Sequence, residues 1–127
     1  MARVAVTGMG GVTAFGSNWP SIRARLKAGV NAVRYMPEWD AMTDLATRLG
    51  APIDDFQPPP HWSRKQLRSM GRVSQLAVRA SELALDDAGL LDDATIRDGR
   101  MGIACGSSVG STPDIRHFVE MLQTGRS

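Results

Sequence analysis

Apolar and polar positions along this chain form blocks that predict an α/β protein. Two short and mainly apolar runs, at residues 3–7 and 101–105, each end in glycines and precede a segment with helix-capping residues. A buried parallel strand that leads through a tight turn into a helix has this pattern. We therefore expect two buried strands, with ligand-binding groups at the sheet edge where they end.

Two shorter segments have the spacing and the end signals of amphipathic helices. The first begins near Asn18, has Pro20 in its first turn and stops at Gly29. The second begins near Ser111 and ends near Gly125. Proline is favoured at helix starts and glycine just after helix ends. The second helix is expected to bury an inner face made of Ile115, Phe118, Val119 and Leu122.

The longest predicted helix runs from Ser63 to Gly89. Ser63 and Gln66 have the spacing of a capping box, and Gly89 is a natural stop. Gly71 lies inside and costs about 1 kcal/mol relative to alanine, which indicates close packing or a local kink. The expected packed face is Leu67, Met70, Val73, Ala77, Ala80 and Ala84. The expected exposed face is Lys65, Arg68, Arg72, Gln75, Arg79, Glu82 and Asp86.

Length and composition limit the class of protein. A chain of 127 residues can bury one modest core, but two strands are too few for a sheet covered by helices. We therefore expect the front part of something larger. The single cysteine excludes an internal disulfide and fits a reducing compartment. No apolar run has the length of a membrane span or of a signal-peptide core, so we expect a cytoplasmic location.

A local cluster of positive charge stands out against a net charge of only +2. It consists of Arg64, Lys65, Arg68 and Arg72. Cations are unfavourable in the first turns of a helix, and these also repel one another. The cluster fits either a solvated face or a surface for an anionic partner, which could be nucleic acid, phosphate or an acidic protein. Only Trp62 lies close enough to stack a base, which is weak support for nucleic acid.

Other candidate sites have simpler interpretations. Gly8 and Gly10 resemble the start of a dinucleotide fingerprint, but Thr13 replaces its third glycine, and residues 28–36 contain no acidic residue. A sharp turn of the backbone is the better interpretation. Cys105 is expected to be a buried and unreactive thiol. Together with the two histidines it lacks the spacing of a zinc site, so no metal is expected.

Taken together, these segments resemble the N-terminal region of the β-ketoacyl-acyl carrier protein synthases, the elongating condensing enzymes of fatty acid synthesis. No single piece is decisive, but the ordered set is specific. The matching pieces, in the family's order and spacing, are residues 4–10 with Gly16, residues 63–65 with Arg68 and Met70, residues 84–90, and residues 102–107 with Gly110.

The resemblance implies an α/β chain that forms the N-terminal part of a thiolase-like fold with α-β-α-β-α layers. Residues 1–127 would then be an incomplete portion of that domain in a homodimeric acyltransferase. The substrate would be a phosphopantetheine thioester on acyl carrier protein, with no other cofactor and with neither nucleic acid nor membrane as partner. The family's cysteine nucleophile and two histidines would follow Ser127, so this chain would hold no catalytic residue and be inactive alone.

The resemblance also carries over two binding roles. Lys65 and Arg68 match basic positions that contact the acidic carrier protein. Ser69 replaces the family's next basic position, so Arg64 or Arg72 would compensate. Val109 matches a residue of the glycine turn that lines the acyl pocket near the dimer interface.

Two alternatives from other classes stay open at this point. One is a non-catalytic protein that binds the carrier or sets chain length as a partner subunit. The other is a small nucleotide-binding domain. The sequence leaves open the acyl chain length and the choice between fatty acid and polyketide synthesis.

Overall fold

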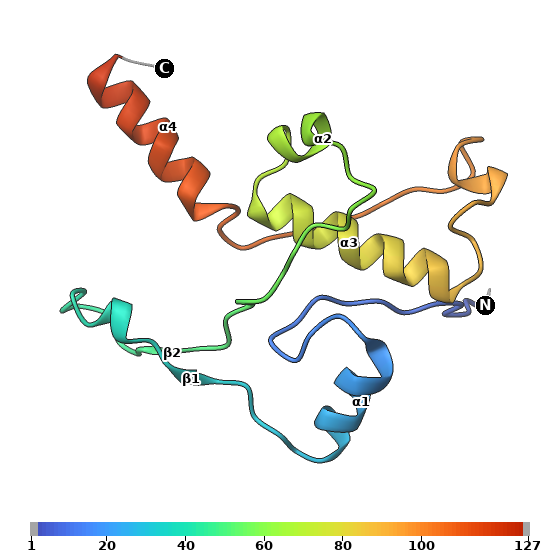
Figure 1. Ribbon diagram of the computed structural model, residues 1–127, viewed down its shortest axis with the longest axis horizontal. Helices are drawn as coiled ribbons and strands as arrows, with labels where there is room; N and C mark the ends of the chain where they lie inside the picture. The colour runs from blue at the N-terminus through green and yellow to red at the C-terminus, as the bar shows by residue number, and fades with distance from the viewer. Residues whose placement is uncertain (1–2, 126–127) are drawn as a thin grey trace.

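The computed structural model describes residues 3–125 and shows an open arrangement around one central helix (Figure 1). That helix is α3, and α4 and the β1–β2 hairpin project away from it. The elements in chain order are α1 (Trp19–Lys27), β1 (Arg34–Tyr35), the 3-10 turn η1 (Pro37–Trp39), β2 (Leu49–Gly50), α2 (Arg64–Arg68), α3 (Arg72–Asp87), the 3-10 turn η2 (Ala94–Ile96) and α4 (Thr112–Thr124).

The predicted helix starts and stops at both ends of the chain are confirmed. Asn18 caps α1, where its side-chain oxygen accepts a hydrogen bond of 3.0 Å from the backbone N–H of Ser21. Gly29 follows α1 with a φ of +66°, in the left-handed region that favours glycine. Ser111 precedes α4, and Gly125 ends it with a φ of +64°.

The prediction of one continuous helix from residue 63 to residue 89 is wrong. The segment divides into α2 and α3, and Gly71 is the N-cap of α3 with an extended backbone. A side chain at Gly71 would overlap the carboxylate of Asp114 and would lie 3.2 Å from Cβ of Ser111. The start of α4 therefore packs against the break, and only a residue without a side chain fits there.

The two predicted buried strands are also corrected. Residues 3–7 and 101–105 pair with no other strand of residues 3–125 and are exposed, with Val4 at 94% and Ile103 at 75%. A strand is stabilised and buried by its neighbours, and the described residues supply none for these two segments. The one sheet described is the antiparallel pair β1–β2, in which Arg34 faces Gly50 and Tyr35 faces Leu49.

Burial is sparse throughout residues 3–125. The buried apolar residues are Ile22 on α1, Met36 after β1 and Trp62 before α2. The expected inner face of α4 is exposed instead, with Phe118 at 53% and Leu122 at 66%. No two described helices pack closely along one another, so the apolar stripe of α4 has no element to cover it.

Candidate functional site

The short helix α2 is defined by its capping box. The backbone N–H of Ser63 donates to Oε1 of Gln66 over 2.8 Å, and the backbone N–H of Gln66 donates to Oγ of Ser63 over 3.3 Å. This reciprocal pair satisfies two of the free donors at the helix start, as the sequence predicts. The cap sets where α2 begins and therefore which side chains it presents.

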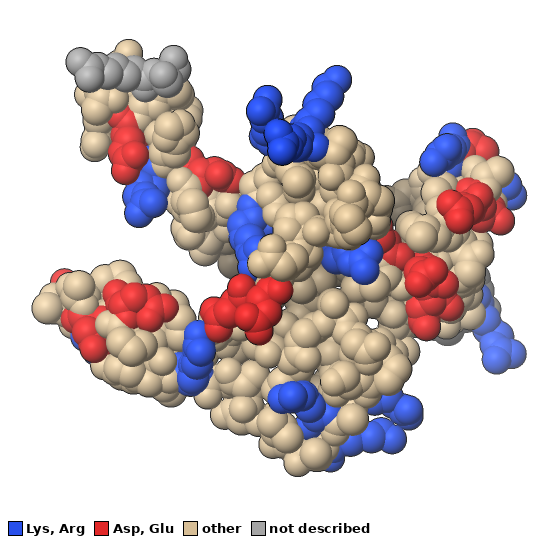
Figure 2. Space-filling view, in the orientation of Figure 1, with Lys and Arg blue, Asp and Glu red and all other residues tan. Residues whose placement is uncertain are grey.

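Three of the predicted docking cations lie together on the outside of α2. Arg64, Lys65 and Arg68 are all exposed, and basic side chains gather over this helix in Figure 2. None of them forms an ion pair with another of the residues 3–125, whereas five other arginines do. Uncompensated cations at this position form a positive surface that is free to meet an anionic partner.

Arg72 is placed differently from the other three. Its guanidinium donates a hydrogen bond of 2.8 Å to the backbone oxygen of Ile53 and lies 4.9 Å from the ring centre of Phe56. Cation–π and carbonyl contacts of this kind hold a side chain against its own protein. In the structure Arg72 therefore ties α3 to the segment before α2, while the exposed positive surface consists of Arg64, Lys65 and Arg68.

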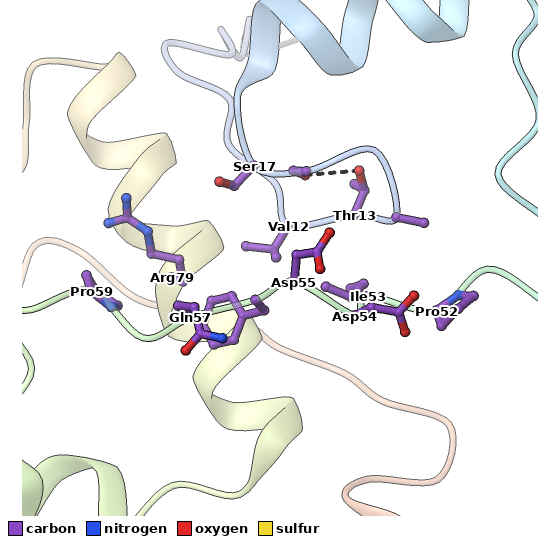
Figure 3. Close-up of a pocket in the computed structure, with 13 residues that line it drawn as sticks. Val12, Thr13, Ser17, Pro52, Ile53, Asp54, Asp55, Gln57, Pro59 and Arg79 are labelled. Atoms are coloured by element: carbon purple, nitrogen blue, oxygen red, sulfur yellow. Dashed lines mark hydrogen bonds between the residues drawn. The ribbon is translucent and has the colours of Figure 1, made fainter.

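A cavity of about 320 Å³ lies between the loop at residues 12–17 and the segment at residues 52–59, with Arg79 at one side (Figure 3). Its charged lining is largely occupied by internal contacts. Asp54 pairs with Arg34 at 2.6 Å, and Arg79 pairs with Glu82 at 3.0 Å. Ser17, Asp55 and Gln57 also line the cavity, which contains none of the predicted site residues.

The remaining candidates of the sequence lie apart from α2. Val109 is 64% exposed in the loop before α4. Cys105 is exposed, so the expectation of a buried thiol is wrong, because the segment that carries it has no neighbouring strand to cover it. His117 is exposed on α4, while His61 lies beside Glu82 of α3. Residues 3–125 contain no group of three potential metal ligands.

The glycines of the N-terminal segment lie against α3. A side chain at Gly8 would lie 2.7 Å from Cβ of Ala88, and one at Gly10 would lie 2.7 Å from Cβ of Leu83. The backbone N–H of Met9 also donates to a carboxylate oxygen of Asp87 over 2.8 Å. These glycines therefore allow the backbone to approach a helix closely, which supports the structural interpretation over a nucleotide site.

One cluster was not predicted from the sequence, because its members are about twenty positions apart. The carboxylate of Glu82 accepts a hydrogen bond of 2.6 Å from the indole N–H of Trp62 and one of 3.0 Å from Arg79. Nε2 of His61 lies 3.1 Å from the same carboxylate. The spacing of a helix surface places Glu82 on the exposed face, yet its side chain is only 21% exposed.

These contacts also set the ionisation of Glu82. Burial by itself raises the pKa of this carboxyl, but the hydrogen bonds from Trp62, His61 and Arg79 together outweigh burial. The pKa of Glu82 therefore lies below its ordinary value. A charged Glu82 at neutral pH is a strong acceptor for these donors.

Among the described residues, no helix is both long and apolar enough to cross a bilayer. The exposed cations of α2 are the clearest candidate for a binding surface among residues 3–125.

Comparison with known families gives one consistent match. The family described as "Beta-ketoacyl synthase, N-terminal domain" matches residues 1–126. The 3-oxoacyl-(acyl-carrier-protein) synthase 1 of Haemophilus influenzae is 32% identical over 87% of this chain and 27% of its own length. The granaticin polyketide putative β-ketoacyl synthase 1 of Streptomyces violaceoruber is 32% identical over 98% of this chain and 29% of its own length.

Solved structures give the same result. The crystal structure of a β-ketoacyl synthase from Burkholderia phymatum STM815 is 62% identical, with a TM-score of 0.85 over 98% of this chain and 31% of the other. The ishigamide ketosynthase/chain length factor is 29% identical, with a TM-score of 0.70 over 98% of this chain and 30% of the other. The chain thus spans less than a third of the length of these proteins.

Proposed function

Because this chain belongs to the β-ketoacyl synthase family, we propose that it forms the N-terminal part of a 3-oxoacyl-acyl carrier protein synthase of fatty acid synthesis. The observation that carries the proposal is the similarity of 98% of the chain to a β-ketoacyl synthase, with a TM-score of 0.85 and 62% identity. The non-catalytic alternative is not favoured, since the curated relatives are named as synthases.

The proposed reaction joins two carrier-bound thioesters. A cysteine thiolate takes the acyl group from one phosphopantetheine thioester, and the carrier thiol leaves. Malonyl-carrier protein then loses carbon dioxide, and its enolate attacks the acyl-enzyme and releases the thiolate. The thiolate and the histidines would come from the remaining two thirds of the family's length, with no catalytic group from this chain and no further cofactor.

The proposal also accounts for the open arrangement of residues 3–125. In a complete thiolase-like fold with α-β-α-β-α layers, the rest of the enzyme would supply neighbours for residues 3–7 and 101–105. The same part would cover the apolar stripe of α4. We assign Val109 to the acyl pocket of this assembly and place the assembly in the cytoplasm as a homodimer.

The part of the function that this chain would perform directly is docking of the acidic carrier protein. Arg64, Lys65 and Arg68 offer three exposed cations on one short helix. Complementary charges of this kind steer the encounter of two proteins and set their orientation. Arg72 would support this surface from behind through its contacts with Ile53 and Phe56.

The test uses the protein as its own host makes it, called the intact protein below. We expect it to condense acyl-carrier protein with malonyl-carrier protein. The double variant Lys65→Glu, Arg68→Glu should raise KM for the carrier substrate about 30-fold, because each surface pair contributes roughly 1 kcal/mol. Its kcat should change little, since neither residue takes part in the chemistry. Added salt should weaken the docking of the unaltered protein.

The matched control reverses two exposed cations elsewhere, in the double variant Arg23→Glu, Lys27→Glu on α1. It changes the net charge equally, so an equal rise in KM would contradict a specific docking surface on α2. An intact protein that binds the carrier without condensing it would instead support the non-catalytic alternative.

A further inference from the structure

The orientation of α2 depends on contacts outside the helix itself. α2 is five residues long and contains no fully buried residue. A helix this short gains little stability from its own hydrogen bonds and is held by its surroundings. The segments on both sides of α2 must therefore fix the direction in which its cations point.

The segment before α2 is attached to α3 through Glu82. Trp62, which directly precedes the N-cap Ser63, is buried to 7% exposure and donates its indole N–H to Glu82 over 2.6 Å. His61 adds a second contact at 3.1 Å. Arg79, one turn earlier on α3, bonds to the other carboxylate oxygen and so fixes the rotamer of Glu82.

The segment after α2 is attached to the same helix. The side-chain amide of Gln75 donates to the backbone oxygen of Met70 over 2.9 Å. Both attachments are on α3, which is 16 residues long and lies at the centre of the molecule (Figure 1). The shorter of the two helices is therefore attached at both ends to the longer one.

We propose that Glu82 is a positioning residue for the carrier-docking surface, acting through Trp62 on the direction of Arg64, Lys65 and Arg68. The inference rests on the function proposed above. Glu82 carries a negative charge and does not belong to the docking surface, so its direct effect on an acidic partner would be unfavourable. Its contribution to docking comes from the place it gives to the cations.

The test measures the Kd of holo acyl carrier protein for the intact protein and its variants. Glu82→Gln should weaken binding about fivefold, because a neutral amide holds the indole N–H less strongly than a carboxylate. The control is Asp86→Asn, which removes an exposed charge from the next turn of α3. Simple loss of negative charge would tighten binding in both variants, so weaker binding in Glu82→Gln alone supports positioning.

A second variant guards against a general effect on folding. Trp62→Phe keeps an aromatic ring in place but removes the N–H, and it should weaken binding to a similar extent. The two substitutions should not add fully, because Glu82→Gln weakens the same hydrogen bond that Trp62→Phe removes. Full additivity would overturn the proposal.

A double-mutant cycle separates positioning from any other role of Glu82. In the Lys65→Glu, Arg68→Glu background, Glu82→Gln should change the Kd less than twofold, since two of the three cations it positions are gone. A full fivefold loss in that background would overturn the inference. If the charge reversals weaken binding and Glu82→Gln does not, the positioning role is wrong and the docking surface stands. If the charge reversals have no effect, the docking surface and the positioning role are both wrong.

Discussion

Single residues decide how closely the N-terminal segment approaches α3. Gly10 lies so close that a methyl group there would be 2.6 Å from the backbone oxygen of Ala80. At Gly11, by contrast, the nearest atom would be Cγ2 of Thr13 at 3.8 Å, an ordinary contact. Two neighbouring glycines therefore have different roles, and their sequence context alone does not distinguish them.

This difference gives a matched pair of substitutions. Gly10→Ala should destabilise the intact protein by about 1–3 kcal/mol, because the backbone must move away from α3 to make room. Gly11→Ala should change the stability by less than about 0.5 kcal/mol. Urea denaturation followed by tryptophan fluorescence measures both. Equal effects of the two substitutions would show that this close approach does not constrain the fold.

The contacts of Glu82 predict that the stability of the folded protein depends on pH, and they determine the sign of that dependence. Its pKa is lower in the folded protein than its ordinary value of 4.5, so the folded state binds fewer protons there than the unfolded state does. The stability that Glu82 contributes is therefore complete above about pH 4.5 and is lost as the pH falls through the folded value.

The measurement compares the urea midpoints of the unaltered intact protein and Glu82→Gln between pH 7 and pH 3. The gap between them should be constant from pH 7 to about pH 5 and should narrow below that. Asp86→Asn serves as the control. A gap that stays constant down to pH 3 would mean that the contacts of Glu82 do not depend on its charge.

At the scale of elements, the helix ends are predictable from the sequence, and the helix break is not. The capping box of Ser63 with Gln66 is a local interaction, so four consecutive residues are enough to reveal it. The break at Gly71 depends on Asp114, which lies far away in the sequence. Periodicity indicates one helix here because it contains no information about what approaches the helix from outside.

The candidate site also has one part that the sequence predicts and one part that it does not. The exposed cations of α2 follow from composition and helix spacing, and the structure confirms that Arg64, Lys65 and Arg68 are exposed. The cluster around Glu82 joins two segments about twenty residues apart and has no local signature. Glu82 and Asp86 both lie near the end of the predicted exposed face, so the charge pattern does not distinguish the residue that has partners from the one that does not.

At the scale of the whole molecule, the two missing strands have one physical cause. Residues 3–7 and 101–105 have the composition of strands buried on both faces. A strand of this kind exists only within a sheet, and the sheet described here contains two short strands from other segments. The sequence therefore predicts the environment of a larger protein, in agreement with relatives that are more than three times as long.

The exposed surface leads to the last prediction, which concerns residues 1–127 produced alone. The described structure has an accessible surface of 10248 Å², whereas a compact protein of 13.7 kDa exposes about 6,600 Å². Much of the excess is apolar, including Val6 at 80% and Ile103 at 75%.

We expect this polypeptide to lack a cooperative thermal transition at low concentration and to bind a hydrophobic dye. Small-angle scattering should give a radius of gyration above the roughly 14 Å of a compact chain of this length. A sharp, reversible transition with a compact radius would mean that these residues form a stable core by themselves, and that the rest of the family's fold is not needed to bury their apolar faces.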